Sequence, residues 1–346
     1  MRSRARIDPR LVLPVVGVLL FGALIVFGER AIDRSTRAGE RPRTRVRLAY
    51  FPNLTHAPAL IGVAEGRFQR ALGPAVELSP KVVNAGPEAM QALLAGEIDL
   101  AYVGPSPATN AYLRSAGKAL RIVAGAASGG ASLVAAGDSR IEGVKDLGGK
   151  KVAVPQLGGT QDVSLRHFIA AAGFAPVPNG GTVDIIPGGN ADILTLFKQH
   201  RIDAAWVPEP WATRIVLEAG GRRAVDERDL WPGHRFATTV LVARTGFLGQ
   251  HPELVGAMVK ENAAIIAWIA KSPKAAMNAA NAQLKVLSGK ALSDEVLSES
   301  WSRLSFEADP NRASIEGFAE AAFECGYAKQ RPGDLSGLFH MEAGPP

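Results

Sequence analysis

The chain has 346 residues, of which 47% are hydrophobic and 21% are charged, and its formal net charge is +6. This composition is typical of a folded globular protein and excludes a disordered chain, while the length predicts two lobes. Ten of the 39 Lys and Arg residues but only four of the 33 Asp and Glu residues lie before residue 46, so 29 of each sign follow. The balanced remainder argues against nucleic-acid binding, which normally needs a basic face.

The chain begins with a basic segment, residues 1–10, followed by an uncharged and mostly apolar stretch over residues 11–28. That stretch is just long enough to cross a bilayer, so it predicts an uncleaved transmembrane anchor; a cleaved signal peptide is the alternative. Both flanks are basic and do not decide the orientation. We expect a periplasmic or other extracytoplasmic domain, tethered to the cytoplasmic membrane by a polar linker over residues 29–45.

Strands and helices then alternate along the first part of the chain. The pattern predicts strands over 46–51, 76–83, 98–103 and 120–123, and helices over 57–66, 87–95 and 107–116. Proline at a first helical position and glycine after the last one mark the helix over 87–95. Such alternation is typical of a mostly parallel sheet covered on both faces, which is the α/β class.

A second set of elements begins near Ile141. It predicts strands over 151–154, 183–186 and 202–207, with helices over 161–172, 191–200 and 211–219. A strand over 238–243 is expected to return to the first lobe, and the remainder from His251 is mainly helical. We therefore assign residues 46–137 and 238–346 to lobe 1, and residues 138–237 to lobe 2.

Four segments share one local design, in which an apolar strand runs into a Gly or Pro turn and a helix follows. They are residues 53–58, 104–107, 158–162 and 208–211. Each junction can direct unpaired backbone N–H groups and a positive helix end toward one point. The design predicts a receptor for a small anion.

Three segments carry a resemblance to a known family: residues 86–107, residues 146–155 together with 159–162, and residues 202–211. They resemble the solute-binding proteins of bacterial ABC importers for nitrate, aliphatic sulfonates, taurine and bicarbonate, and the similarity covers about residues 46–270. The resemblance implies a two-lobed periplasmic-binding-protein fold of type II, with mixed sheets and two crossovers. It also implies a ligand held between the lobes, no catalysis, and partnership of a monomer with a permease and an ATPase.

Hydroxyl, amide and imidazole groups at the junctions are the candidate ligand contacts. Ser106 and Thr160 can either cap the helix that follows or bind a ligand oxygen. Polar side chains also follow the first strand, where ligands of open α/β sheets collect. The full set of candidates comprises Tyr50, Asn53, His56, Gly86, Ser106, Thr160, Gln161, Asn190, Glu209 and Trp211.

Two acidic residues, Glu209 and Asp162, carry a negative charge that opposes the binding of an anion. A carboxylate at Glu209 would repel a sulfonate, so we expect it to stabilise lobe closure or to bind the ammonium group of a zwitterion such as taurine. Asp162, in a first helical turn, partly competes with an anionic ligand for the helix dipole. Trp211 can supply a flat apolar wall or pack between the lobes.

No residue is assigned a catalytic or metal-binding role, and no cofactor is expected. The single cysteine, Cys325, excludes an internal disulfide and a Cys-based metal site, and neither a Gly-x-Ser-x-Gly elbow nor a His-x-x-x-His pair is present. The leading hypothesis is a substrate-binding component of an ABC importer for a small oxyanion, with an aliphatic sulfonate as the favoured ligand. A binder of a thiamine-pyrimidine precursor and a sensory ectodomain are the alternatives.

Overall fold

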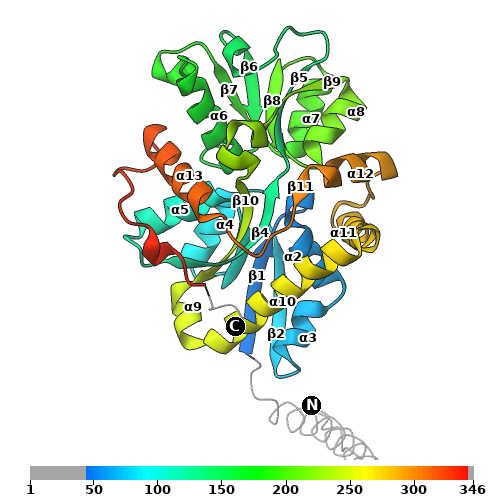
Figure 1. Ribbon diagram of the computed structural model, residues 1–346, viewed down its shortest axis with the longest axis vertical. Coiled ribbons are helices and arrows are strands. Elements are labelled where there is room, and N and C mark those ends of the chain that lie inside the picture. The colour runs from blue at the N-terminus through cyan, green and yellow to red at the C-terminus, as the bar shows by residue number, and fades with distance from the viewer. Residues whose placement is uncertain (1–43, 342–346) are drawn as a thin grey trace, which may run out of the picture. The chain divides into compact units, whose positions relative to one another are not determined.

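The computed structural model describes residues 44–341, which form two sheets with helices on both faces of each (Figure 1). The predicted basic segment, the predicted anchor and nearly all of the predicted linker lie outside the described residues. Within residues 44–341, no helix combines the length and the apolar character needed to cross a membrane. The first strand begins at Thr44, two residues before the predicted start of lobe 1.

The first sheet has six strands in the order β11-β4-β10-β3-β1-β2. Their bounds are β1 Thr44–Tyr50, β2 Val76–Val82, β3 Leu100–Val103, β4 Leu120–Gly129, β10 Ala237–Arg244 and β11 Leu304–Ser305. β1 is parallel to β3, whereas β10 runs antiparallel to both β3 and β4. The sheet is therefore mixed, because the strand that returns late in the chain is inserted in the opposite direction.

Helices cover both faces of this sheet because alternate side chains of its strands point in opposite directions. Leu48 and Tyr50 of β1 pack on one side and Ala49 and Phe51 on the other. The first face carries α2 (Ala57–Ala64), α3 (Arg67–Leu72), α10 (Pro252–Lys271) and α11 (Pro273–Ser288), and the second carries α4 (Gly86–Leu94), α5 (Pro105–Arg114) and α13 (Arg312–Glu324). Two further helices, α9 (Thr245–Gln250) and α12 (Asp294–Ser302), flank α10 and α11 along the chain.

The second sheet has five strands in the order β7-β6-β8-β5-β9. They are β5 Ala131–Ala136, β6 Lys151–Val154, β7 Asp184–Pro187, β8 Ala204–Pro208 and β9 Gly221–Asp226. β6 is parallel to β7 and β8, while β5 is antiparallel to β8 and β9. One face packs on α6 (Thr160–Ala171) and the other on α7 (Asn190–Lys198) and α8 (Trp211–Ala219).

Two connections join the sheets. The chain leaves the first sheet at Gly129 and Gly130, whose φ angles of +73° and +70° suit glycine, and it returns between β9 and β10. β5 therefore belongs to the second sheet, so the chain crosses before the predicted lobe boundary at residues 137–138. In Figure 1, β4 and β10 run from the lower sheet toward the upper one, where these crossings lie.

The return connection contains a buried carboxylate, Glu227. It is fully buried and accepts hydrogen bonds from Ser164 Oγ at 2.6 Å, from Trp206 Nε1 at 2.6 Å and from Trp231 Nε1 at 3.2 Å. Burial raises the pKa of Glu227 to about 7, although these hydrogen bonds favour the charged form. Burial prevails because none of the three donors carries a charge.

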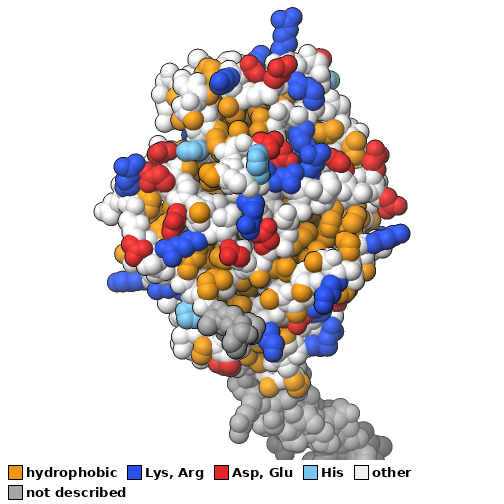
Figure 2. Space-filling model, viewed as in Figure 1, with side chains coloured by type: hydrophobic (Ala, Val, Ile, Leu, Met, Phe, Trp, Pro, Cys, Tyr) orange, Lys and Arg blue, Asp and Glu red, His pale blue; other side chains and the backbone are white. Residues whose placement is uncertain are grey.

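Charges of both signs are interspersed over the visible face of the molecule (Figure 2). Several charged residues of the described part of the chain form ion pairs, among them Arg67 with Glu261 at 2.6 Å and Arg303 with Glu299 at 2.7 Å. This face has no continuous basic surface, in agreement with the balance of charges after residue 45.

Candidate ligand-binding cleft

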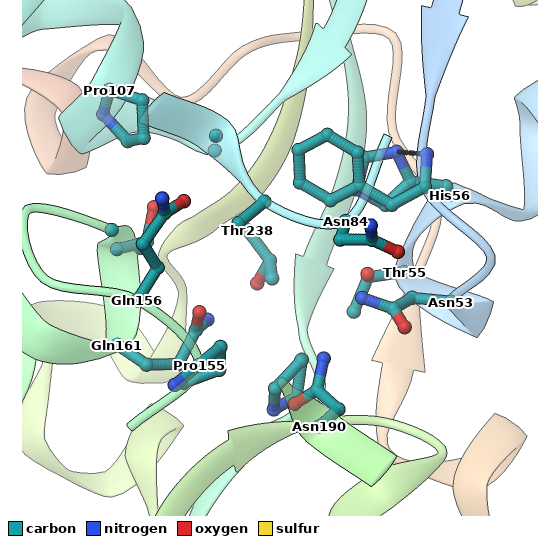
Figure 3. A pocket seen from close by; sticks show the side chains of 17 residues that line it. Asn53, Thr55, His56, Asn84, Pro107, Pro155, Gln156, Gln161, Asn190 and Thr238 are labelled. Atoms are coloured by element: carbon teal, nitrogen blue, oxygen red, sulfur yellow. Dashed lines mark hydrogen bonds between the residues drawn. The ribbon is translucent and has the colours of Figure 1, made fainter. Parts of the chain in front are cut away.

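A cleft of about 40 Å³ lies where the two sheets meet (Figure 3). The turns and strand ends of the first sheet contribute Phe51, Asn53, Thr55, His56, Asn84, Ala85, Gly86, Gly104, Pro107 and Thr238; the second sheet contributes Pro155, Gln156, Gly159, Thr160, Gln161, Asn190 and Pro208. The volume corresponds to roughly three water-sized groups. In this conformation the cleft suits a small ligand or a small headgroup.

None of these lining residues is Lys, Arg, Asp or Glu. Hydrogen-bonding capacity comes from amide, hydroxyl and imidazole groups, and Figure 3 shows Asn53, Asn84, Gln156 and Asn190 around the same space. An anion bound here would be held by neutral donors, and its charge would have to be stabilised by dipoles rather than by a countercharge.

His56 is held as a neutral hydrogen-bond donor. Its ring stacks on Phe51 at a centroid distance of 4.2 Å, and the Phe51 backbone N–H donates to Nδ1 at 3.4 Å. Complete burial lowers the pKa of His56 to about 3. With Nδ1 as acceptor, the assigned tautomer carries its proton on Nε2 and can donate it to a ligand.

Thr160 is the strongest candidate contact. It is the first residue of α6, and Gly159 is the N-cap, so the Thr160 hydroxyl does not cap its own helix. The side chain is 4% exposed, and Oγ1 has no hydrogen-bond partner within residues 44–341. An unsatisfied buried hydroxyl costs about 1–3 kcal/mol, so a ligand or water that accepts its proton would recover that energy.

Asn190 repeats this arrangement at the start of α7. Gly189 is the N-cap, Asn190 is the first helical residue, and its buried Oδ1 likewise lacks a partner in the described part of the chain. The N-termini of α6 and α7 thus border the cleft. Beside each one lies a polar side chain with a buried oxygen that has no hydrogen-bond partner in the described part of the chain. Both helices follow strands of the second sheet.

The first sheet contributes fewer backbone donors than its junctions predict. Proline occupies the second position of α2 and of α4, and α5 begins with Pro105 and has Pro107 at its third position. Proline has no N–H, so each one removes a donor that would otherwise be free at a helix N-terminus. Side chains such as Asn53, His56 and Asn84 provide the polar groups on this side instead.

The two sides of the cleft touch where Gly104 meets Thr160. A Cβ atom built on Gly104 would lie 2.1 Å from Thr160 Oγ1 and 3.2 Å from Thr160 Cβ. Gly104 precedes α5 and Thr160 begins α6, so this contact joins helices that belong to different sheets. It leaves no room for a side chain at residue 104.

Family membership follows from a match between residues 39–284 and the model of the NMT1-like family. The chain belongs to the NMT1-like family. Among curated relatives of this family member, a protein of Brucella abortus strain 2308 named as a binding protein is 29% identical over 185 residues, which are 53% of this chain and 54% of that relative. The chain thus spans about half the length of the curated relatives it matches first.

Solved structures show that this NMT1-like protein has a periplasmic-binding-protein fold. The alkanesulfonate-binding protein SsuA from Xanthomonas axonopodis pv. citri, bound to MOPS, gives a TM-score of 0.69 at 17% identity, with 84% of this chain and 96% of that chain covered. The nitrate-binding protein NrtA from Synechocystis PCC 6803 gives 0.68 at 17% identity, with 83% of each chain covered. At this identity the likeness establishes the fold alone. That fold is the one that the resemblance in sequence implied.

Six of the candidate contacts line the cleft of this family member, namely Asn53, His56, Gly86, Thr160, Gln161 and Asn190. Their contact with a ligand stays a prediction. Several lining residues were not predicted from the sequence, including Phe51, Thr55, Asn84, Gln156 and Thr238. Asn84 had a usable signal, because it lies between β2 and α4 at the same kind of junction as the others.

Two candidates lie away from the cleft. Tyr50 is buried on the face of the first sheet that packs against α10 and α11, and Gln283 Nε2 donates to its hydroxyl at 3.2 Å. Phe51 reaches the cleft instead, because neighbouring residues of a strand point to opposite faces. Ser106 is fully buried in α5, and although its Oγ lacks a partner among residues 44–341, it does not line the cleft.

Glu209 does not line the cleft either. The side chain is fully buried; Oε1 accepts a hydrogen bond from Arg223 Nη2 at 3.0 Å, and Oε2 accepts one from the Thr213 backbone N–H, also at 3.0 Å. Burial raises the pKa of Glu209, and the Arg223 guanidinium opposes that shift. The carboxylate holds the start of α8 against β9, so it is not available to a ligand ammonium.

Trp211 acts on the cleft indirectly. It does not line the cleft, but its indole N–H donates to Asn53 Oδ1 at 2.9 Å and thereby joins α8 to the segment that follows β1. Asp162 is likewise not a lining residue: its side chain is fully buried, and Arg166 Nε donates to Oδ1 at 2.8 Å. Arg166 thus offsets the charge that was expected to compete with an anion.

Within the described range, no group of three or more His, Cys, Asp or Glu side chains is arranged to hold a metal ion.

Proposed function

We propose that this protein is the solute-binding component of an ABC importer and that it captures a small oxyanion between its two sheets. The observation that carries the proposal is the buried, partnerless Thr160 hydroxyl at the start of α6, inside a cleft without charged side chains. A helix N-terminus with a free hydroxyl beside it is a favourable site for an oxyanion. The binding-protein names of the relatives, rather than enzyme names, support a function without catalysis.

An aliphatic sulfonate is the ligand class that we favour, with taurine and nitrate as close alternatives. A sulfonate or nitrate presents three oxygens, which match the Thr160 hydroxyl, the Nδ2 amide group of Asn190 and the imidazole N–H of His56 from different sides of the cleft. The small cleft volume fits such a headgroup better than a bulky organic ligand. Pairing of Glu209 with Arg223 weakens the argument for a zwitterion, because the residues that line the cleft itself include no Asp or Glu to bind an ammonium group.

The remaining features of the proposal follow from this role. The two predicted lobes, residues 46–137 with 238–346 and residues 138–237, would close on the ligand. Their first boundary would move to Gly129–Gly130, where the chain crosses between the sheets. The protein would work as a monomer outside the cytoplasm, held at the membrane by its N-terminal segment, and would deliver the ligand to a permease driven by an ATPase.

Isothermal titration calorimetry tests the proposal directly. We expect ethanesulfonate, taurine or nitrate to bind with a micromolar Kd, and Thr160→Val to weaken that binding by more than about tenfold, or about 1.4 kcal/mol. The matched control is Thr195→Val, because Thr195 lies on the exposed side of α7 and its hydroxyl donates to the Ala191 carbonyl. Absence of binding by every one of these anions, together with sulfate, would refute the function.

A second candidate is a binder of an aminopyrimidine such as a thiamine precursor. The specific observation is that the cleft is uncharged and presents the amide groups of Asn84, Gln156 and Gln161, which can pair with the edge of a heterocycle. The same calorimetry with an aminopyrimidine separates the two functions. Tight binding of the pyrimidine, with no heat from the anions, would favour the second.

A further inference from the structure

The loop over residues 155–159 has the cleft on one side and a second cavity on the other. Pro155, Gln156 and Gly159 line the cleft, while Leu157 and Gly158 line a cavity of about 270 Å³ that also includes residues of α4 and α5. Leu157 is 45% exposed. Because space lies on both sides, the position of this loop depends on a few specific contacts.

Tyr327, in the segment that follows α13, makes one of those contacts. Its hydroxyl donates to Asp162 Oδ2, and the same oxygen accepts the Gly158 backbone N–H at 2.8 Å. The tyrosine ring also packs on Gly158, where a Cβ atom would lie 3.5 Å from ring carbon Cε1. Burial and the nearby Asp162 carboxylate raise the pKa of Tyr327, so the hydroxyl keeps its proton and remains a donor.

Asp162 links this contact to the ligand residues. It stands two residues after Thr160 in the first turn of α6, and Arg166 fixes its other oxygen with an Nε–Oδ1 distance of 2.8 Å. The Arg166 guanidinium lies 5.5 Å from the centre of the Tyr327 ring. One carboxylate therefore connects the loop, the start of α6 and the C-terminal segment.

The C-terminal segment also contacts both parts of the molecule. α13 packs against α5 and against α6, which cover different sheets. Beyond α13, Tyr327 lines the second cavity together with Pro107 of α5. A tyrosine held in this place can couple the position of α5, which covers the first sheet, to the position of the loop over residues 155–159 beside the second sheet.

We propose that Tyr327 is a positioning residue for ligand binding, which acts through Asp162 to hold the loop over residues 155–159 and the Thr160 hydroxyl in place. The ligand part of this proposal rests on the proposed function, whereas the positioning of the loop is independent of it. The ring of Tyr327 supplies packing, and its hydroxyl supplies the positioning contact.

Hydrogen–deuterium exchange of the ligand-free protein tests the positioning. In Tyr327→Phe, which keeps the ring, we expect the amides of residues 158 and 159 to exchange about tenfold faster, while the amides of β6 and β8 keep their wild-type rates. Tyr112→Phe is the matched control, because Tyr112 lies on α5 beside the C-terminal segment and its hydroxyl faces Gly117 and Gly337. Unchanged exchange in the loop, or an equal increase throughout the second sheet, would overturn the proposal.

A double-mutant cycle tests whether Tyr327 acts through Asp162. Tyr327→Phe should add little to the exchange rates of Asp162→Asn, and additive effects would show that the two residues act independently. Calorimetry with nitrate and with taurine then measures the consequence for binding, where we expect a three- to tenfold weaker Kd for Tyr327→Phe. Wild-type affinity in a variant with a loosened loop would reject the role in binding. If the wild type binds neither probe, the proposed function fails, while the exchange data still decide whether Tyr327 positions the loop.

Discussion

Gly104→Ala is the sharpest perturbation of the cleft, because it adds a single methyl group at the contact between the two sides. The backbone of Gly104 has φ −70° and ψ 156°, which alanine adopts without strain. The added Cβ would stand 2.1 Å from Thr160 Oγ1, whereas ordinary carbon contacts are about 3.5–4.0 Å. Since Gly104 and Thr160 belong to different sheets, the clash is relieved if the two parts separate by somewhat more than an ångström.

Overpacking of this kind costs about 1–3 kcal/mol. Under the proposed function, in which the two lobes close on the ligand, this cost falls on the closed form, so we expect the Kd for nitrate or taurine to rise about 5- to 150-fold. The melting temperature of the ligand-free protein should change little, because the open form accommodates the methyl group. Calorimetry and thermal unfolding of the same samples measure both quantities.

A matched control and a double variant make the result decisive. Gly143→Ala adds a methyl group where no atom lies within 4 Å and should bind as the wild type does. Combined with Thr160→Ala, which removes the clashing oxygen, Gly104→Ala should cost less than it does alone. Wild-type affinity in Gly104→Ala would show that the contact between α5 and α6 is not part of the ligand-bound form.

Three further predictions concern Glu227, His56 and Trp211. Burial raises the pKa of Glu227 from 4.5 to about 7, so the folded state binds more protons than the unfolded state between these pH values, and its stability falls as the pH rises. In urea unfolding, Glu227→Gln should remove about 3 kcal/mol of this loss of stability. An unchanged slope of stability against pH from pH 4.5 to 7 would contradict this prediction. Burial lowers the pKa of His56 from 6.5 to about 3, so the unfolded state binds more protons, and the folded state loses up to about 5 kcal/mol of stability as the pH drops below 6.5. In urea unfolding, His56→Gln should reduce this loss of stability at acid pH. An unchanged loss in the variant would show that other groups cause it. Trp211→Phe removes the indole N–H that donates to Asn53 Oδ1, and it should weaken nitrate or taurine binding about fivefold in calorimetry. Trp268→Phe should leave binding unchanged, because Trp268 is a half-buried residue of α10 that stacks with Arg67. Equal effects of the two variants would exclude a specific role for the Asn53 contact.

The sequence predicted the elements that carry a strong apolar period and a clear start. The helix over residues 211–219 is α8, Trp211–Ala219, and the alternation over residues 46–51 marks β1. Strands β5 and β9 were not predicted. β5 is a short Ala-rich run after two glycines, and β9 is largely polar at the edge of its sheet, so neither has the pattern of a buried strand.

Within the site, the sequence located the turns better than the directions of their side chains. Strand alternation shows that Tyr50 and Phe51 face opposite sides, but it does not show which side borders the cleft. The partners of the acidic residues were beyond reach for a different reason: Glu209 meets Arg223 through the pairing of strands, and Asp162 meets Tyr327 across 165 positions of the chain. Such contacts depend on the tertiary fold, which local patterns do not encode.

Because prolines stand at the starts of α2, α4 and α5, the two walls of the cleft differ in the number of backbone N–H donors that they offer. The starts of α6 and α7 contain no proline, so under the proposed function an oxyanion would gain most of its main-chain hydrogen bonds from that wall of the cleft. The opposite wall, which has fewer N–H groups, would then exclude water and select ligands by shape through the side chains of Asn53, His56 and Asn84. Affinity and selectivity would accordingly be governed by different halves of the protein and could be altered separately.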